Sequence, residues 1–394
     1  MENFVYECPA KVLFGRGAAK EHLGKALSAY GPNVMLAYGG GSIRGNGVYD
    51  EMMEILRAAD KAVTEFRGIT PNPTYAKVQE GAALAREKRI DFILAVGGGS
   101  VIDCCKVVAA QAVLEEDIWD MELVRHRLPS VPPIPMGAVV TASGTGAEMN
   151  GGAVITHEEK KIKTGIFAAA PRFAVLDPEY TLSVPFSQVI SGAFDTLSHA
   201  METYFGRADR DNVSDDIAEA VMRNTIRGMR ALLQNPDDYT ARSNLMWDSA
   251  MAENGILKCG RATDFQAHQI EHQLGAYTDC GHGQGLAVIH PPLYRRVCEK
   301  ALEKFARLAV NVWGVSGEGK TERELALAGV EALADFIAKC GLPLRLRDLR
   351  MKGEPEKLLT DSVLREISDS CNLIQTGQAG VSHDEIFEIL KECL

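Results

Sequence analysis

The sequence predicts an α/β domain in its N-terminal half, followed by an all-helical domain in its C-terminal half. Two observations support this fold class: short apolar runs that end in glycine recur in the first half, and long helical patterns fill the second. A chain of 394 residues is also too long for one small hydrophobic core, so its length predicts two domains. We place the boundary near residue 183, which gives domains over residues 1–183 and 184–394.

Four apolar runs predict strands that are buried on both faces, as in a parallel sheet. They cover residues 33–38, 92–96, 136–140 and 173–176. Apolar stripes at helical spacing lie between the first two and predict helices, one through Val48 and Met52 and one through Val78 and Ala82. Such an alternation of strands and helices is typical of a layered α/β domain.

After Pro185 the pattern changes and predicts helices alone. The helical stretches are interrupted by glycine, by Asn235-Pro236 and by Gly341-Leu342-Pro343. The predicted helices cover residues 186–205, 214–234, 238–258, 284–313, 321–340 and 382–393.

Charge and composition exclude several classes of function. Acidic residues outnumber basic ones by 53 to 42, which disfavours nucleic-acid binding and attachment to a membrane surface. No apolar run reaches the roughly 18 residues of a transmembrane helix, and the N-terminus carries no secretory signal pattern. Nine cysteines without a CxxC pair suit a reducing compartment, so we expect a cytoplasmic protein.

One glycine-rich loop predicts a phosphate site. Gly97, Gly98, Gly99 and Ser100 follow the strand over 92–96 and open a helix that contains Asp103. Glycines let the backbone come close to a phosphate, and the start of a helix offers free N–H groups. The alternative is a tight turn that only needs glycine. We favour a pyrophosphate, and therefore a dinucleotide.

A second such loop bears on which dinucleotide binds. Gly39, Gly40, Gly41 and Ser42 follow the strand over 33–38, and Arg44 is close by. Dinucleotide folds that bind NAD usually place an acidic residue at such a position, where it accepts the ribose hydroxyls. No acid follows this strand, so the loop favours NADP(H), with NAD(H) still possible.

Histidines and one aspartate in the second half predict a metal site. Asp195 and His199 are four residues apart and share a helix face. His268 and His282 follow later in the chain. One carboxylate and three imidazoles suit Fe²⁺ or Zn²⁺ equally and leave room for a substrate oxygen.

One motif points to a different reaction. Residues 268–272 read HQIEH and match the H-x-x-E-H pattern of one class of metallopeptidase. In that interpretation His268 and His272 bind zinc and Glu271 is the general base. The motif is short, and a peptidase has no use for the glycine-rich loops, so the peptidase remains the less favoured alternative.

Six segments together resemble the iron-containing (group III) alcohol dehydrogenases, nearest their butanol dehydrogenase branch. The segments are PNP (71–73), GGGSVIDCCK (97–106), TASGTGAEMN (141–150), LDPEYTLSVP (176–185), SGAFDTLSHAMETY (191–204) and AHQIEHQLGAYTDCGHGQGLAV (267–288). The resemblance covers essentially the whole chain. It implies the two-domain architecture of dehydroquinate synthase, with an N-terminal dinucleotide-binding domain and a C-terminal metal-binding domain.

The resemblance also implies roles for individual residues. Asp195, His199, His268 and His282 hold the metal, whereas His272 lies beside the nicotinamide as the catalytic residue. The residues expected at the cofactor are Gly39, Gly40, Gly41, Ser42, Arg44, Asn72, Gly97, Gly98, Gly99, Ser100, Asp103, Thr141, Ser143, Thr145, Lys163 and Leu182. Cys104 and Cys105 replace the family's alanines and place two thiols near the cofactor helix.

The sequence therefore predicts an enzyme that interconverts a primary alcohol, of a kind similar to butanol, and its aldehyde with NADP(H). The alternatives are polyol oxidation of the glycerol dehydrogenase type, the peptidase, and a nucleotide-binding protein without catalysis. We also expect a homodimer, because the segment from Phe4 to Phe14 reads as a strand with an unprotected edge.

Overall fold

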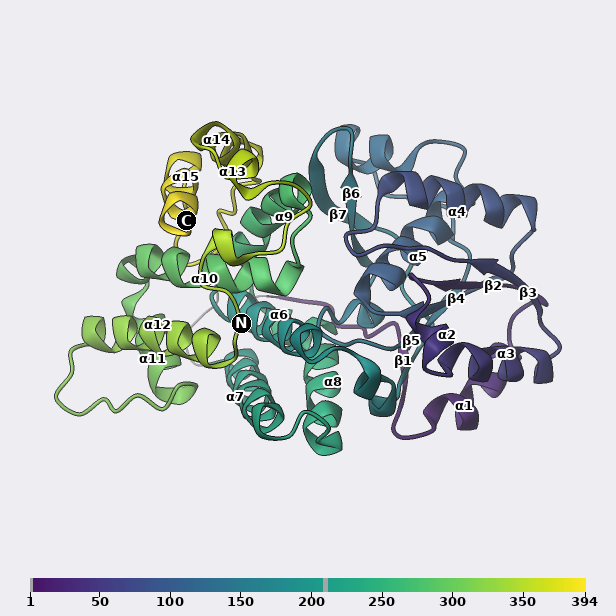
Figure 1. The fold of residues 1–394 in the computed structure, drawn as a ribbon, viewed down its shortest axis with the longest axis horizontal. Helices are drawn as coiled ribbons and strands as arrows, with labels where there is room; N and C mark the ends of the chain where they lie inside the picture. Colours follow the sequence, from purple (N-terminus) through teal and green to yellow (C-terminus); the bar gives the residue numbers. More distant parts are fainter. Residues whose placement is uncertain (1–2, 208–211) are drawn as a thin grey trace. The chain divides into compact units, whose positions relative to one another are not determined.

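Two structural units divide the chain in the computed structural model, which describes residues 3–207 and 212–394 (Figure 1). One unit spans Glu7–Pro185, and the other comprises Phe186–Leu394 together with the N-terminal residues as far as Tyr6. The sequence predicts a boundary near residue 183 and assigns the whole N-terminus to the first domain. In the structure Tyr6 instead packs beside Gly255 of the helical unit, where a Cβ atom would lie 3.8 Å from the Tyr6 ring.

The first unit is built on a six-stranded sheet in which every pairing is parallel. In spatial order the strands are β1 (Lys11–Phe14), β8 (Phe173–Leu176), β5 (Met136–Val140), β4 (Phe92–Gly97), β2 (Asn33–Tyr38) and β3 (Ala62–Phe66). All four predicted apolar runs are strands, which confirms the α/β fold class. Strand β3 was not predicted because it lies at the sheet edge and buries only Phe66.

Helices cover both faces of this sheet, which explains why its strands read as apolar runs (Figure 1). Helices α1 (Ala18–Leu27) and α3 (Val48–Ala58) share a core with alternate residues of the strands, including Leu36 and Leu94. On the other face lie α4 (Tyr75–Glu87) and α5 (Gly99–Gln111). Side chains along a strand alternate between the faces, so both sets become buried.

Several smaller elements of this unit carry no strong sequence pattern and were not predicted. They are the antiparallel pair β6 (Gly152–His157) and β7 (Ile162–Phe167), the short helices α2 (Ser42–Gly45), η2 (Ala147–Met149) and η3 (Pro178–Ser183), and the π-helix η1 (Asp120–Val124). The N-terminal strand is shorter than predicted, because only Lys11–Phe14 pair with a neighbour.

Within its described residues the second unit contains helices and no strand, as the sequence predicts. Its helices are α6 (Phe186–Tyr204), α7 (Val213–Gln234), α8 (Tyr239–Glu253), η4 (Ile256–Lys258), α9 (Gln266–Thr278), α10 (His282–Val297), η5 (Cys298–Lys300), α11 (Leu302–Asn311), α12 (Glu322–Lys339), η6 (Leu346–Asp348), α13 (Pro355–Leu358), α14 (Asp361–Ser370) and α15 (His383–Glu392). The single helix predicted over 284–313 is in fact α10, η5 and α11.

Local sequence signals fix the ends of several of these helices. Thr321 and Glu324 form a capping box at the start of α12, and Ser382 and Glu385 form another at the start of α15.

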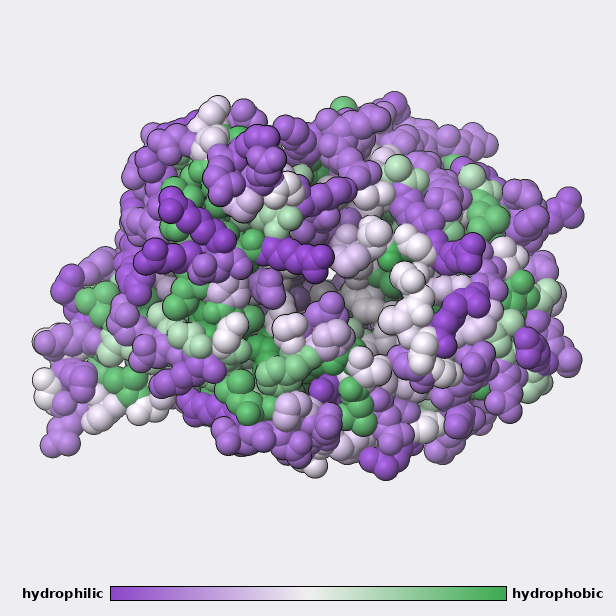
Figure 2. Space-filling view, viewed as in Figure 1, coloured by the Kyte–Doolittle hydropathy of each residue, from purple (hydrophilic) through white to green (hydrophobic). Residues whose placement is uncertain are grey.

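Hydrophilic residues cover most of the surface on the face shown in Figure 2, with small hydrophobic groups between them. Within residues 3–207 and 212–394, no helix has the length and apolar character needed to cross a bilayer.

Candidate metal centre and cofactor loops

Three helices of the second unit bring the predicted metal ligands together. Asp195 and His199 lie one turn apart on α6, in a stretch that is buried from Ala193 to Tyr204. His268 lies in the first turn of α9, and His282 is the first residue of α10. The spacing of four residues on α6 therefore acts as predicted, because it turns both side chains to the same face.

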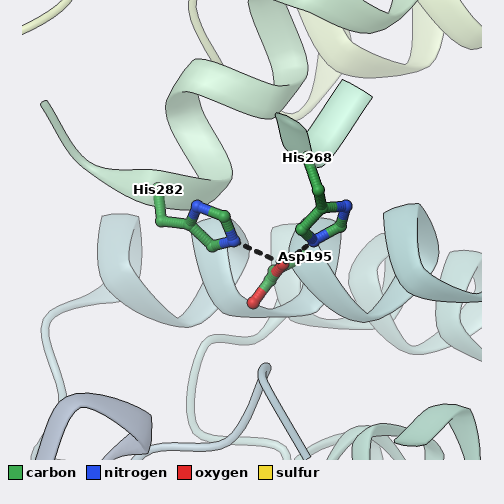
Figure 3. Close-up of side chains that lie close together, drawn as sticks. All are labelled: Asp195, His268 and His282. Carbon is green, nitrogen blue, oxygen red and sulfur yellow. Dashed lines mark ion pairs between the residues drawn. The ribbon is translucent and has the colours of Figure 1, made fainter. Parts of the chain in front are cut away.

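One oxygen of Asp195 lies at the centre of this group. The Nε2 atoms of His282 and His268 lie 3.4 Å and 3.5 Å from Asp195 Oδ1. Figure 3 shows both imidazole rings directed at the Asp195 carboxylate. The ligand atoms of these three residues all lie within 4.8 Å of one another. His199 is not part of this close group, but its Nδ1 lies 3.7 Å from the same Asp195 oxygen.

Hydrogen bonding within the protein does not satisfy these atoms. Asp195 Oδ1, His199 Nδ1 and His268 Nε2 are buried, and none of the three has a hydrogen-bond partner. Buried polar atoms are rarely left in this state, so each needs an explanation. A carboxylate oxygen and imidazole nitrogens that converge on one point are a donor set for a divalent cation such as Fe²⁺ or Zn²⁺, so the residues fit a metal ion.

Two buried glutamates orient the imidazole rings from behind. Glu202 contacts Nδ1 of His268, and Glu271 contacts Nδ1 of His282. Each ring donates its Nδ1 proton to the carboxylate and turns its Nε2 toward Asp195. Carboxylates commonly hold metal-bound histidines in this way. Glu202 was not predicted from the sequence, although it lies seven residues after Asp195 and hence on the same face of α6.

Electrostatics in the group favour an ionised carboxylate. Burial raises the pKa of Asp195, but the imidazoles of His199 and His282 outweigh this effect and hold that pKa well below its usual range. Burial lowers the pKa of His268, whereas Glu202 and Asp195 raise it to about 10. A cation that binds Nε2 of His268 therefore has to displace a proton.

His272 lies next to the centre but outside the group around Asp195. Its ring stacks on that of His282 at 5.7 Å and stands nearly perpendicular to that of His268 at 6.0 Å. Glu271 is fully buried and accepts from His282, so it is not placed as a general base that faces substrate. This geometry argues against the peptidase interpretation, in which His268 and His272 would bind the same ion.

In the first unit, the loop at Gly97–Ser100 joins the end of β4 to the start of α5. Gly98 is the N-cap of α5, so the loop presents the free N–H groups of a helix N-terminus. A Cβ atom at Gly99 would lie 2.3 Å from the Thr145 hydroxyl. Only glycine lets this loop pack so closely against the segment that follows β5.

Asp103 has a different environment from the one expected of a cofactor contact. Its Oδ1 lies 3.3 Å from Nζ of the fully buried Lys106, and its Oδ2 accepts a hydrogen bond from the Val154 backbone. Lys106 also donates to Asn150 and to the carbonyl of Gly152. These contacts connect α5 to the start of β6. Asp103 therefore helps to fix the position of the helix that follows the Gly97–Ser100 loop.

An acid from strand β3 reaches the second glycine-rich loop. Arg44 donates to Glu65 Oε2 and to the Tyr38 hydroxyl, and its guanidinium lies 4.0 Å from the centre of the Tyr49 ring. Glu65 belongs to β3 and is paired in register with Leu36 of β2. It is distant along the chain from the loop it reaches, which is why no acid was expected there.

The remaining predicted cofactor residues are dispersed over the first unit. Thr141, Ser143 and Thr145 follow β5, and the Thr141 backbone donates to Gly97, so this segment adjoins the Gly97–Ser100 loop. Lys163 lies on β7 and is buried. Asn72 adopts a left-handed conformation before α4. Leu182 lies in η3 and is partly exposed.

The two adjacent thiols of the proposed cofactor helix, Cys104 and Cys105, are protected from oxidation by burial. Cys104 and Cys105 are both fully buried in α5. Burial raises the pKa of Cys104 to about 12 and that of Cys105 well above its usual range. The thiolate is the reactive form of cysteine, so these residues are poor targets for oxidation.

Both halves of the chain match one protein family. Residues 9–178 match the iron-containing alcohol dehydrogenases, and residues 189–394 match the C-terminal part of the Fe-containing alcohol dehydrogenase family. Among curated relatives, the NADH-dependent butanol dehydrogenase A of Clostridium acetobutylicum is 35% identical over 100% of both chains. The NADPH-dependent aldehyde reductase YqhD of Escherichia coli is 34% identical over 90% of both.

Solved structures show the same similarity. The crystal structure of the NADH-dependent butanol dehydrogenase A of Thermotoga maritima superimposes with a TM-score of 0.91 at 36% sequence identity. The match covers 100% of this chain and 99% of that one.

Proposed function

Because the chain belongs to the iron-containing alcohol dehydrogenase family, an oxidoreductase family that uses a nicotinamide cofactor and a metal ion, we propose that it interconverts a primary alcohol and its aldehyde by hydride transfer. We propose substrates similar to butanol, since relatives at 35–38% identity are named as butanol dehydrogenases. The observation that supports the reaction most directly is the Asp195 oxygen surrounded by three imidazole nitrogens at 3.4–3.7 Å.

The proposed roles follow from the contacts around each side chain. A divalent ion held by Asp195, His199, His268 and His282 supplies a Lewis acid for the alcohol or aldehyde oxygen. Glu202 and Glu271 keep two of these imidazoles aligned. His272 orients the substrate and relays its proton, because its buried ring stacks on that of a ligand without joining the ligand group.

The first unit provides the proposed cofactor site. The N–H groups at Gly98–Ser100 bind the pyrophosphate, and the adjoining segment from Thr141 to Thr145 lines the nicotinamide end. The redox chemistry itself belongs to the nicotinamide. The packing of Gly99 against Thr145 fixes these two segments relative to each other.

A cofactor-oxidation assay with butanal tests the proposal. NADPH or NADH consumption should depend on butanal and stop after treatment with a chelator, and glycerol should support little of the reverse reaction. Turnover that is unaffected by complete removal of metal would contradict it. Metal analysis of protein purified without air would distinguish Fe²⁺ from Zn²⁺, both of which suit imidazole and carboxylate ligands.

We further propose that the enzyme prefers NADPH to NADH. No acid follows β2, and the Ser42 hydroxyl and the Arg44 guanidinium lie in the loop where a 2′-phosphate would bind. Glu65 weakens this preference, because its carboxylate pairs with Arg44 and repels a phosphate. The relatives do not decide the matter, since some are named for NADH and others for NADPH.

Variants of this loop should therefore change the ratio of kcat/KM for the two cofactors. Glu65→Gln should move the ratio toward NADPH by on the order of two- to fivefold, because it removes one partly exposed charge. Gly39→Asp should move it toward NADH. A Cβ atom at position 39 would lie only 3.2 Å from the Ile69 carbonyl, so Gly39→Asn is the matched control for the steric effect. Equal kcat/KM values for both cofactors in the wild type would refute the preference.

We also propose a homodimer. Strand β1 lies at the edge of the sheet, and Phe4, Val5 and Tyr6 before it are exposed. An open strand edge favours association, and so do exposed apolar side chains. Light scattering should give twice the 42.8 kDa mass of one chain, and a 42.8 kDa species at micromolar concentration would contradict the proposal.

A further inference from the structure

A buried network of hydrogen bonds extends from Glu202 away from the metal centre. Ser198 lies on α6, one turn before Glu202, and its hydroxyl is 3.5 Å from Glu202 Oε2. On its other side the same hydroxyl lies 2.7 Å from Nε2 of His290 on α10. Ser198 and His290 are both 0% exposed. The chain therefore runs from His268 through Glu202 and Ser198 to His290.

The direction of these hydrogen bonds follows from the acceptors. Glu202 Oε1 accepts from the backbone amides of Ala267 and His268, and Oε2 accepts from His268 Nδ1. An ionised carboxylate can only accept, so Ser198 donates to it. The Ser198 oxygen then accepts from Nε2–H of His290, which leaves Nδ1 of that ring without a proton.

The surroundings of His290 agree with this tautomer. Its Nδ1 has no hydrogen-bond partner, and an unmatched acceptor is tolerated better than an unmatched N–H donor. The rings of Tyr294 and Phe194 pack beside it at 4.8 Å and 5.9 Å. Burial lowers the pKa of His290 to about 4, so the ring is neutral at physiological pH.

We infer that Ser198 and His290 are positioning residues of the metal centre. They hold the Glu202 carboxylate, and Glu202 in turn holds His268 with its Nε2 facing Asp195. Burying a serine and a histidine is unfavourable unless they are hydrogen-bonded, and here Ser198 bonds to both Glu202 and His290. The inference rests on the proposed metal set, because it assigns these two residues an effect on the affinity of that set.

The test measures metal binding without turnover. The full-length protein is stripped with a chelator and titrated with Co²⁺, and the visible absorption of the bound ion reports both affinity and ligand geometry. Partners behind a ligand typically change metal affinity by about 10–100-fold. Because Ser198 acts through Glu202, we expect Ser198→Ala to weaken Co²⁺ binding by about tenfold, at the lower end of that range, and to shift the absorption band.

Matched variants separate positioning from packing. Ser214 is a similarly buried serine in the same unit whose hydroxyl donates to the Cys259 carbonyl and not to the metal centre, so Ser214→Ala should leave Co²⁺ affinity unchanged. Ser198→Thr keeps the hydroxyl and should retain most of the affinity. His290→Leu should weaken binding about as much as Ser198→Ala. The double variant should be little worse than either, because both changes break the same chain.

The outcomes distinguish this inference from the proposed function. Failure of the wild type to bind one Co²⁺ would refute the metal set itself. Tight Co²⁺ binding by the wild type and equally tight binding by folded Ser198→Ala would overturn the inference and leave the metal set intact. Affinity as low in Ser198→Thr as in Ser198→Ala would overturn it too. If His290→Leu does not fold, the Co²⁺ affinities of Ser198→Ala, Ser198→Thr and Ser214→Ala test the inference without it.

Discussion

Replacing His282 by alanine is expected to remove the bound metal and to lower kcat by about three orders of magnitude or more. Its Nε2 lies 3.4 Å from Asp195 Oδ1, and its Nδ1 is held by the fully buried Glu271. The variant loses one ligand and leaves the Glu271 carboxylate without its imidazole. Metal content and steady-state rates with butanal measure the effect.

The control for this variant is another histidine of the helical unit. His383 opens α15, and its Nε2 contacts the Cys371 carbonyl, so His383→Ala should retain metal and activity. Thermal unfolding of both variants shows whether the loss at His282 comes from the site or from the fold. Full activity of His282→Ala with no bound metal would contradict the proposed role.

The His272→Ala variant is expected to retain its metal, but its kcat should fall by about 10²–10⁴-fold. This is the usual contribution of a positioned acid or base. The ring of His272 stacks on that of His282 but is absent from the group around Asp195. His272→Gln, which keeps a hydrogen-bonding side chain, should recover part of the rate if the residue mainly orients substrate.

Metal analysis decides between two roles for this residue. Glu271, His272 and His282 also have ligand atoms within 4.8 Å of one another. If the metal content of His272→Ala falls to zero, the residue is a ligand and its proposed catalytic role is wrong. Retained metal together with an unchanged rate would show that it has no part in the reaction.

The sequence predicted those parts of the fold in which burial is uniform. Strand β4 is buried along its whole length and therefore reads as an apolar run, and β2 is buried after its first residue. Strand β3 and the pair β6–β7 are partly exposed and gave no such signal. Helix α9 was missed because its pattern is dominated by polar residues that are nevertheless buried, such as Gln266 and Gln273.

The candidate site was predictable only where residue types reveal their chemistry. Histidines at helical spacing pointed to the metal group, but a glutamate gives no sign of its partner until the chain is folded. Glu202 holds His268, which lies 66 residues later, and Glu65 reaches Arg44 across neighbouring strands. The serine and histidine behind Glu202 meet across 92 residues.

The proposed metal ligands and the proposed nucleotide loops belong to different units of the chain, and this has a consequence for the catalytic cycle. The predicted metal ligands all come from α6, α9 and α10, whereas the predicted nucleotide loops all come from the other unit. A nicotinamide cofactor must leave and be replaced after every turnover, because each molecule carries only one hydride. With no ligand shared between the two sets, this exchange breaks no bond to the ion. We therefore expect the ion to stay bound through the catalytic cycle, while the nucleotide behaves kinetically as a second substrate.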